Sequence, residues 1–441
     1  MQDKKHPLPY SLTIKALSDL GPEQIPTELR TDTQLIYNSP AALDFNSPGA
    51  QGFGVKRAGL AVPGSIMMLI APGCCGRNTK ALQAPGGYGT RFAYLMLSEN
   101  DIVTGKHLKK IPEAAEIFIH SRPTPPTVLM ICITCVDALL GTDMDRVCRQ
   151  IEDRTAIPAR PCYMYALTRE SRLPPMTAVR QTVYSLLKPR KKRANQANLL
   201  GYFSPIAPDS ELFALLQKLG IRHIGELACC KDFSDYEKLS AANFNLVLNP
   251  EARHAADWFR KTLNIPAIEL KRLYEIDKIA RQYEGFARII GAELPAIPDR
   301  QEAETAQHEF CTMHPSIAIA VGSRLNADPF ELALALVRAG LHVKEIYAIP
   351  LPSDFFYIRR LADCSPDTRL YTNLSPSMLN ERESDHPVDL AIGADACYYH
   401  PHAAHVLWNE ETQPFGYQAV CGLFQSMTQA VKARHREENA R

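Results

Sequence analysis

The chain has 441 residues, of which 46% are hydrophobic and 22% charged, and its formal net charge is +1. This composition is typical of a globular protein of two to four domains, and the near-zero charge gives no reason to expect nucleic acid or a membrane as partner. No run approaches the eighteen or so apolar residues of a membrane span, and the first residues lack the apolar core of a secretion signal. We expect a cytoplasmic protein whose twelve cysteines are buried small residues or metal ligands rather than disulfides.

The first part of the chain predicts two buried strands, over residues 65–72 and 127–135. The first strand ends in a Pro-Gly turn followed by the adjacent cysteines Cys74 and Cys75. The second contains the motif C-I-T-C, and a helix over 143–155 follows it, with Asp143 as the expected N-cap. Because residues three apart on a strand point to opposite faces, Cys132 is predicted to lie in the core.

A second series of elements begins near residue 196. We predict strands over 198–203 and 244–249, and helices over 210–220, 250–266 and 271–292. Asp209 is the expected N-cap of the first of these helices, and Gly220 fits its C′ position. The proline-containing segment 293–304 is the expected interdomain connection.

The third series predicts strands over 316–322, 341–350 and 388–395, helices over 328–340 and 417–435, and no fixed-period repeat. Strands that alternate with helices are typical of parallel sheets. The predicted fold class is therefore α/β, with three Rossmann-like domains whose parallel sheets are flanked by helices. The domains are expected at residues 1–165, with the cluster-binding cysteines, at 166–305, and at 306–441 with the C-terminal helix.

Two charged segments have simpler interpretations than a functional site. The basic run 188–193 follows the predicted helix 177–187, and we interpret it as a solvated turn. Glu99 and Asp101 precede several lysines, which favours a mixed-charge surface with a structural or docking role over acid–base catalysis.

Several segments, in order, resemble the nitrogenase component 1 family. "APGCC" is similar to the Gly-Pro-x-x-Cys loop of that family, and "LSENDIVTGKHLKKIPEA" to its Glu-x-Asp-x-Val-x-Gly-Gly segment. "ICITCVDALLGTDMDRVCRQI" resembles its strand–Cys–loop–Gly-x-Asp–helix segment, and "NLLGYF" and "NLVLNPEARHAADWFRKTLNIP" resemble parts of its middle domain. The resemblance covers most of the chain. Ala71 and Lys106 replace glycines of the family pattern.

The resemblance implies that Cys75 and Cys135 bind metal as ligands of an iron–sulfur cluster. Cys74 is the alternative to Cys75, and counting Pro-x-x-Cys from Pro72 favours Cys75. Two thiolates per chain do not complete a four-cysteine site, so the expected cofactor is a [4Fe–4S] cluster shared across a dimer interface. The second chain is either another copy or a related component 1-like subunit.

Two departures from the family pattern bear on function. An earlier cysteine found in the family is absent, and Asp44 and Ser47 are the nearby oxygen-bearing residues. Where nitrogenases carry a cofactor cysteine, this chain has Asn249 at a predicted strand end. We therefore expect no nitrogenase-type molybdenum–iron cofactor. Cys229 and Cys230 either line the interdomain cavity or are inert.

The segment 395–408 concentrates Cys397, His400, His402 and His405. Its position resembles the region where nitrogenases supply a cofactor histidine. These residues form either a metal or acid–base site, with His400 as the expected catalytic residue, or a polar loop with exposed histidines.

The family implies an oxidoreductase subunit that receives electrons from an ATP-dependent iron–sulfur reductase through the interface cluster. A substrate in the interdomain cavity is then reduced. The chain has no Gly-x-x-x-x-Gly-Lys-[Ser/Thr] motif, so ATP binding is expected in the partner. The alternatives are a scaffold for assembly of an iron–sulfur or tetrapyrrole cofactor, and a non-catalytic heterodimer partner. The sequence does not name the substrate or decide whether the chain is an enzyme.

Overall fold

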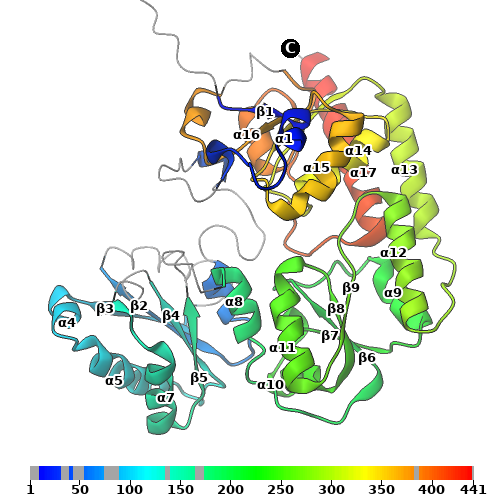
Figure 1. Ribbon diagram of the computed structural model, residues 1–441. Helices are drawn as coiled ribbons and strands as arrows, with labels where there is room; N and C mark the ends of the chain where they lie inside the picture. Colours follow the sequence, from blue (N-terminus) through cyan, green and yellow to red (C-terminus); the bar gives the residue numbers. More distant parts are fainter. Residues whose placement is uncertain are drawn as a thin grey trace, which may run out of the picture. The chain divides into compact units, whose positions relative to one another are not determined.

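The structure is a computed structural model that describes residues 9–30, 39–42, 54–73, 89–134, 140–163, 173–381 and 387–439. The described residues form three sheets flanked by helices, which confirms the predicted α/β fold class (Figure 1). The chain divides into two compact units. One consists of residues 1–47, 206–219 and 272–441, and the other of residues 48–205 and 220–271.

The first sheet has the strand order β3-β2-β4-β5, and all its strands are parallel. Its strands are β2 (Ile66–Pro72), β3 (Phe92–Leu97), β4 (Leu129–Ile133) and β5 (Ala159–Tyr163), and its helices are α2 (Gly54–Gly59), α4 (Glu99–Val103), α5 (His107–His120), α7 (Met144–Thr155) and α8 (Pro175–Thr182). Alternate residues of β2 enter different cores, because successive side chains of a strand point to opposite faces. Ile66, Met68 and Ile70 pack with α5 and α7, whereas Met67 and Leu69 pack in a second core with α8.

The middle sheet has the order β7-β6-β8-β9 and is also parallel. Its strands are β6 (Arg193–Leu200), β7 (His223–Glu226), β8 (Ala242–Val247) and β9 (Ala267–Glu269), and its helices are α10 (Phe233–Lys238) and α11 (Arg253–Leu263), with 3₁₀ turns at Leu227–Cys229, Leu239–Ala241 and Pro250–Ala252. Leu200, Val247 and Phe259 share the second core with Met67 and Leu69. One hydrophobic core therefore joins the first and middle sheets.

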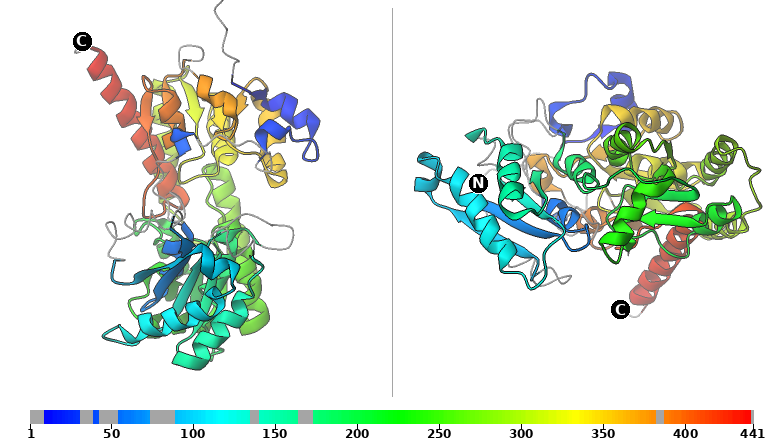
Figure 2. Two further views of the ribbon diagram at one scale, coloured as in Figure 1. Left: turned by 90° about the vertical axis from the view of Figure 1, so that its left-hand side faces the viewer. Right: turned by 90° about the horizontal axis from the view of Figure 1, so that it is seen from below.

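The third sheet has the order β1-β12-β11-β10-β13-β14, in which only β1 is antiparallel to its neighbour. Its strands are β1 (Leu12–Thr13), β10 (Ala318–Val321), β11 (His342–Tyr347), β12 (Arg369–Tyr371), β13 (Leu390–Ile392) and β14 (Ala404–Val406). The helices of this unit are α1 (Ile14–Leu20), α9 (Glu211–Lys218), α12 (Ile276–Ile289), α13 (Asp299–Met313), α14 (Pro329–Arg338), α15 (Phe355–Cys364), α16 (Ala394–Tyr399) and α17 (Gly416–Asn439), with 3₁₀ turns at Thr27–Leu29, Pro40–Ala42, Pro352–Asp354 and Pro376–Asn380. Figure 2 shows α17 as one long helix near the end of the chain; α17 packs against α13 and β14.

Hydrogen bonds explain why α9 belongs to the unit of the third sheet. The buried carboxylate of Glu211 accepts hydrogen bonds from the Tyr283 hydroxyl and the Tyr417 main-chain N–H, both at 2.7 Å. It therefore caps the amino end of α17, where main-chain N–H groups lack helical partners. Burial raises the pKa of Glu211, and its hydrogen bonds oppose that shift.

Some of the predicted helix caps are confirmed, and one is wrong. The Asp143 side chain accepts from the Arg146 N–H at 2.9 Å, and Gly220 follows α9 with φ +86°, as expected. Ser210, rather than Asp209, caps α9 because its hydroxyl accepts from the Leu212 N–H. The segment expected as an interdomain connection contains the start of α13 at Asp299. Domain boundaries near residues 165 and 305 stay a prediction.

Candidate functional site

The carboxyl ends of β2 and β4 lie side by side in the first sheet. Ile70 pairs with Ile133 in the parallel register, and the Thr134 hydroxyl donates to the Ile70 carbonyl at 3.3 Å. Cys135 directly follows Thr134, and Cys75 lies two residues beyond Gly73. Cys74, Cys75 and Cys135 themselves lie outside the described residues, as do Asp44 and Ser47. Both thiol-bearing segments therefore start from the same edge of the sheet, where sites of open α/β sheets form.

A tyrosine fixes the last residues of β2. The Tyr94 hydroxyl, on the neighbouring strand β3, lies 3.1 Å from the Ala71 carbonyl and 2.7 Å from the Pro72 carbonyl. These carbonyls lie beyond Ile70, where the pairing of β2 with β4 ends, although its pairing with β3 continues to Pro72. The segment that leads to Cys75 thus leaves a strand end held by hydrogen bonds.

The other cysteine of the C-I-T-C motif lies in the core, as the alternation rule predicted. Cys132 has no exposed surface and packs with Met130 and Cys162. Burial raises the pKa of the Cys162 thiol well above its usual value. A buried thiol among apolar side chains behaves as a small hydrophobic residue.

The acidic pair near this edge has a structural role. The Ser98 hydroxyl accepts from the Asp101 N–H at 3.2 Å, and the Asp101 carboxylate accepts from the Ser98 N–H at 2.9 Å, which together form a capping box for α4. Asp101 also forms an ion pair with Lys110 at 2.6 Å. The hydrogen bond from Lys110 and those from Ser98 lower the pKa of Asp101. The carboxylate thus stabilises the start of a helix.

His400 lies fully buried beside the third sheet. Its Nε2 is 2.8 Å from Oε2 of Glu345 and 3.1 Å from the Tyr347 hydroxyl, and that hydroxyl donates to the same Glu345 oxygen at 2.8 Å. Glu345 is only 2% exposed. Nδ1 of His400 has no hydrogen-bond partner among the described residues. His400 is therefore held in a buried triad, and its catalytic role stays a prediction.

The other histidines of the segment do not gather around His400. Nε2 of His405 bonds the main-chain oxygen of His400 at 2.8 Å, and His402 is exposed. Across the described ranges, no three His, Cys, Asp or Glu side chains form a group able to hold a metal ion. Nothing in those ranges supports a three-histidine metal site.

A second buried network closes the carboxyl edge of the third sheet, where β10 and β13 meet. The Asp395 carboxylate accepts from the main-chain N–H groups of Ser323 (2.9 Å) and Arg324 (3.0 Å), and from the Ser323 hydroxyl and Asn373 amide (both 2.8 Å). This is the point where strand order reverses and where doubly wound sheets usually bind ligands. In this sheet an internal carboxylate fills that position.

Sequence reasoning missed Glu345, Tyr347 and Asp395. A signal was present for each carboxylate. Glu345 is an acidic residue that alternates with Val343 and Tyr347 along a strand, and Asp395 follows a strand end by way of Gly393. The pairing of Glu345 with His400 was not visible, because 55 residues separate them.

In the middle sheet, Asn249 caps a 3₁₀ turn. Its side-chain oxygen accepts from the Glu251 N–H at 3.0 Å.

Cys229 and Cys230 line a pocket of about 360 Å³ that is formed within this domain. Burial raises the pKa of these thiols to about 11 and about 12 respectively, so both are neutral near pH 7.

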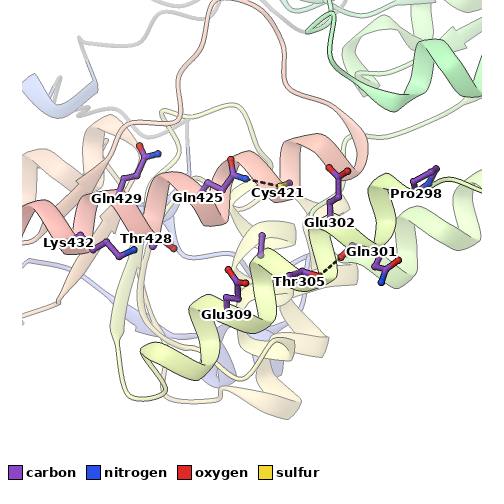
Figure 3. A pocket seen from close by; sticks show the side chains of 11 residues that line it. Pro298, Gln301, Glu302, Thr305, Glu309, Cys421, Gln425, Thr428, Gln429 and Lys432 are labelled. Atoms are coloured by element: carbon purple, nitrogen blue, oxygen red, sulfur yellow. Dashed lines mark hydrogen bonds between the residues drawn. The ribbon is translucent and has the colours of Figure 1, made fainter.

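A larger groove of about 670 Å³ lies between α13 and α17 (Figure 3). Its lining is mainly amide, hydroxyl and carboxyl side chains, including Gln301, Glu309 and Gln425, together with the ammonium group of Lys432. The Gln425 amide lies 3.3 Å from the Cys421 sulfur. These mixed polar groups favour no single charge class of ligand.

Comparison with known proteins identifies the family. The model of nitrogenase component 1 type oxidoreductases matches residues 50–394. The chain belongs to this family. The resemblance inferred from the motifs is therefore confirmed.

Two relatives are nitrogenase iron-molybdenum cofactor biosynthesis proteins NifE. The protein of Nostoc sp. (strain PCC 7120) is 27% identical over 213 residues, which are 47% of this chain and 44% of that protein. The protein of Rhizobium meliloti (strain 1021) is 24% identical over 352 residues, 74% of this chain and 72% of that protein. The match thus spans less than half of the Nostoc relative.

Nitrogenase Cp1, solved at pH 6.5, has a similar structure. Its TM-score is 0.67 at 14% identity, and the match covers 96% of this chain and 98% of that chain. This likeness shows a shared fold.

None of the helices described here is long and apolar enough to cross a bilayer.

Proposed function

We propose that this chain is a subunit of a scaffold on which an iron–sulfur cofactor is assembled, with Cys75 and Cys135 as its cluster ligands. The observation that carries the proposal is the match, over 74% of the chain, to a relative named for cofactor biosynthesis. Asn249 agrees with this function, because it puts a helix-capping amide where the family resemblance led us to look for a cofactor thiolate. A scaffold holds its product less permanently than an enzyme holds its cofactor.

The residues near the proposed ligands fit an iron–sulfur cluster. Gly73 and Thr134 follow neighbouring strands, so the segments with Cys75 and Cys135 begin close to one another. Thiolates are the usual ligands of iron–sulfur clusters, and two from each of two chains make the four of a [4Fe–4S] site. The second chain is either another copy or a related component 1-like subunit.

The described residues would hold the ends of these segments in place. Tyr94 fixes the last carbonyls of β2, and Thr134 links the ends of β4 and β2. A bound cluster would supply one-electron chemistry at this edge. We also propose an ATP-dependent iron–sulfur reductase as a partner.

A second candidate, a catalytic subunit of a nitrogenase-like reductase, is favoured by the family's description as an oxidoreductase. In that case the reductase partner delivers electrons to a substrate that this chain helps to bind, with His400 as the proposed catalytic residue. The two functions differ in what leaves the protein: a cluster from the scaffold, or a reduced product from the enzyme.

The first experiment is anaerobic purification of the chain, alone and with a co-expressed component 1-like partner, followed by iron and sulfide analysis. Cys75→Ala and Cys135→Ala should each reduce bound iron to background. The exposed Cys364, on α15, provides the control substitution Cys364→Ala, which should leave iron unchanged. Cys74→Ala tests the neighbouring thiol in the same assay. A wild-type protein without iron, or iron that survives both substitutions, would overturn the cluster assignment.

The second experiment gives the loaded protein reductase and ATP and follows iron-55. Transfer of labelled cluster to an apo component 1 acceptor supports the scaffold. Retention of the label during multiple turnovers of a reduced substrate contradicts the scaffold and supports the enzyme.

A further inference from the structure

The pocket of about 360 Å³ in the middle domain lies along the whole of β7 and beside the amino half of β6. These strands are parallel neighbours, with Gln196 opposite His223. Arg193 begins β6, and Arg222 immediately precedes β7, so the strand pairing brings both arginines to the same end of the sheet. The two arginines lie at the opposite end of the sheet from Asn249. The volume of the pocket is within the usual range for small-ligand sites.

The basic run 188–193 is fixed beside this pocket by contacts with residues 237–240. Arg190 forms an ion pair with Glu237 at 2.8 Å, and Lys192 donates to the Ser240 carbonyl at 3.0 Å. On the next part of β6, the Gln196 amide donates to the Lys238 carbonyl at 2.7 Å. The run predicted as a solvated turn is largely exposed, and two of its side chains contact residues next to the pocket lining.

Three cationic or titratable side chains of the pocket have no carboxylate partner. Arg193, Arg222 and His223 line it, and within the described part of the chain none forms an ion pair or side-chain hydrogen bond. Lys238 is different, because Asp235 pairs with it at 2.7 Å. Glu226 is the other carboxylate among the described lining residues, and the two guanidinium groups outnumber it.

The two cysteines do not offset this positive charge. Burial keeps the Cys229 and Cys230 thiols neutral near pH 7, as described above, and the Cys230 thiol lies 3.3 Å from the Glu226 carbonyl. An anion in the pocket therefore faces uncharged thiols and unpaired guanidinium groups.

We propose that this pocket binds a small multivalent oxyanion of the phosphate class. Guanidinium groups offer paired N–H donors that match two oxygens of a phosphate, and such charge-assisted hydrogen bonds are stronger than neutral ones. Two arginines at the ends of adjacent strands can contact two phosphoryl groups of one ligand. The site is independent of the cluster ligands proposed above.

The test is calorimetric titration of the full chain with inorganic pyrophosphate and with inorganic phosphate at low ionic strength. Pyrophosphate should bind saturably and more tightly than phosphate. The double variant Arg193→Gln/Arg222→Gln should weaken pyrophosphate binding by at least tenfold, and His223→Gln by a smaller factor. Arg260→Gln on α11 is the matched control, because that exposed arginine pairs with Asp257 and does not line the pocket; it should change binding less than twofold.

Two results would overturn the proposal. The first is the absence of saturable heat with pyrophosphate. The second is equal pyrophosphate binding by wild type and the double variant.

Discussion

The first sheet is parallel and the third is parallel except for β1, and both are Rossmann-like, yet their carboxyl edges differ. In the third sheet, the Asp395 carboxylate lies at the switch point, where it accepts hydrogen bonds from the Asn373 amide and from main-chain N–H groups of the loop after β10. In the first sheet, β2 and β4 lead into segments with cysteines. The topology therefore offers a site at each carboxyl edge. A few side chains decide whether an internal carboxylate occupies that site or whether it stays available to a ligand.

Removal of the Asp395 carboxylate should have the largest effect on stability. Asp395→Ala leaves four donors around a fully buried position without their acceptor, so we expect a loss of about 3–5 kcal/mol in the stability of the third sheet. Hydrogen exchange followed by mass spectrometry would measure this loss in peptides of β10 and β13. Asp101→Ala, at the exposed capping box of the first sheet, should have a much smaller effect on β2 and β4. Equal effects would contradict the contrast between the edges.

Two glycines, Gly322 after β10 and Gly73 after β2, test the same contrast. A Cβ on Gly322 would lie 2.0 Å from Oδ1 of Asp395, whereas the only described atom within 4 Å of a Cβ on Gly73 would be the Met96 sulfur at 3.7 Å. Because Asp395 is fixed by its hydrogen bonds, Gly322→Ala should cost about 2–4 kcal/mol, and Gly73→Ala less than about 1 kcal/mol. The same exchange measurement checks both. A tolerated Gly322→Ala would show that the Asp395 network can shift.

The His400 triad should depend on its carboxylate. Glu345→Ala removes the partner of both His400 and Tyr347, and we expect it to destabilise the unit by about 2–3 kcal/mol. Glu345→Gln keeps an acceptor for the Tyr347 hydroxyl and should cost less. Urea unfolding followed by Trp408 fluorescence, in a Trp258→Phe background, measures this unit. Unchanged stability in Glu345→Ala would argue that the triad serves chemistry rather than packing.

A pH dependence of the same unit should be the smallest effect. Burial raises the pKa of Glu331 to about 8, although N–H groups of Tyr274 and Glu275 donate to its carboxylate. The folded chain therefore holds the proton more tightly than the unfolded chain. The stability that this proton contributes is complete below the unfolded pKa of about 4.3, and it is lost as pH rises through about 8.

Glu331→Gln should remove this loss, which we expect to be about 1–2 kcal/mol between pH 6.5 and pH 8. The measurement is the Trp408 unfolding curve at each pH, with the exposed Glu309→Gln as control. Parallel pH curves for wild type and Glu331→Gln would contradict a buried, protonated Glu331.

The fold was predictable where local pattern dominates. Runs such as 66–72 and 129–133 are apolar enough to indicate buried strands, and Asp143 caps its helix through a contact three residues away. Two-residue β1 and three-residue β12 and β14 have too few residues for a period to appear, and β1 depends on a partner near residue 370. Tertiary contact, rather than propensity, determines such elements.

The sequence motifs predicted only one part of the candidate site. The motifs placed Cys75 and Cys135 after strands that do prove to be neighbours. The motifs did not show that His400 would be buried against Glu345, because burial of a loop histidine depends on side chains from β11. The pocket with Arg193 and Arg222 was hidden for the same reason: its two arginines meet only through the pairing of β6 with β7.

The antiparallel pairing of β1 with β12 has a consequence for synthesis of the protein. Leu12 pairs with Leu370, so β1 leaves the ribosome about 360 residues before its partner. At 5–20 residues per second, this strand waits roughly 20 to 70 seconds without its sheet. During that time the next strands of the chain, which belong to another unit, can complete their own core. The order of translation therefore makes the unit that contains both ends of the chain the last to close.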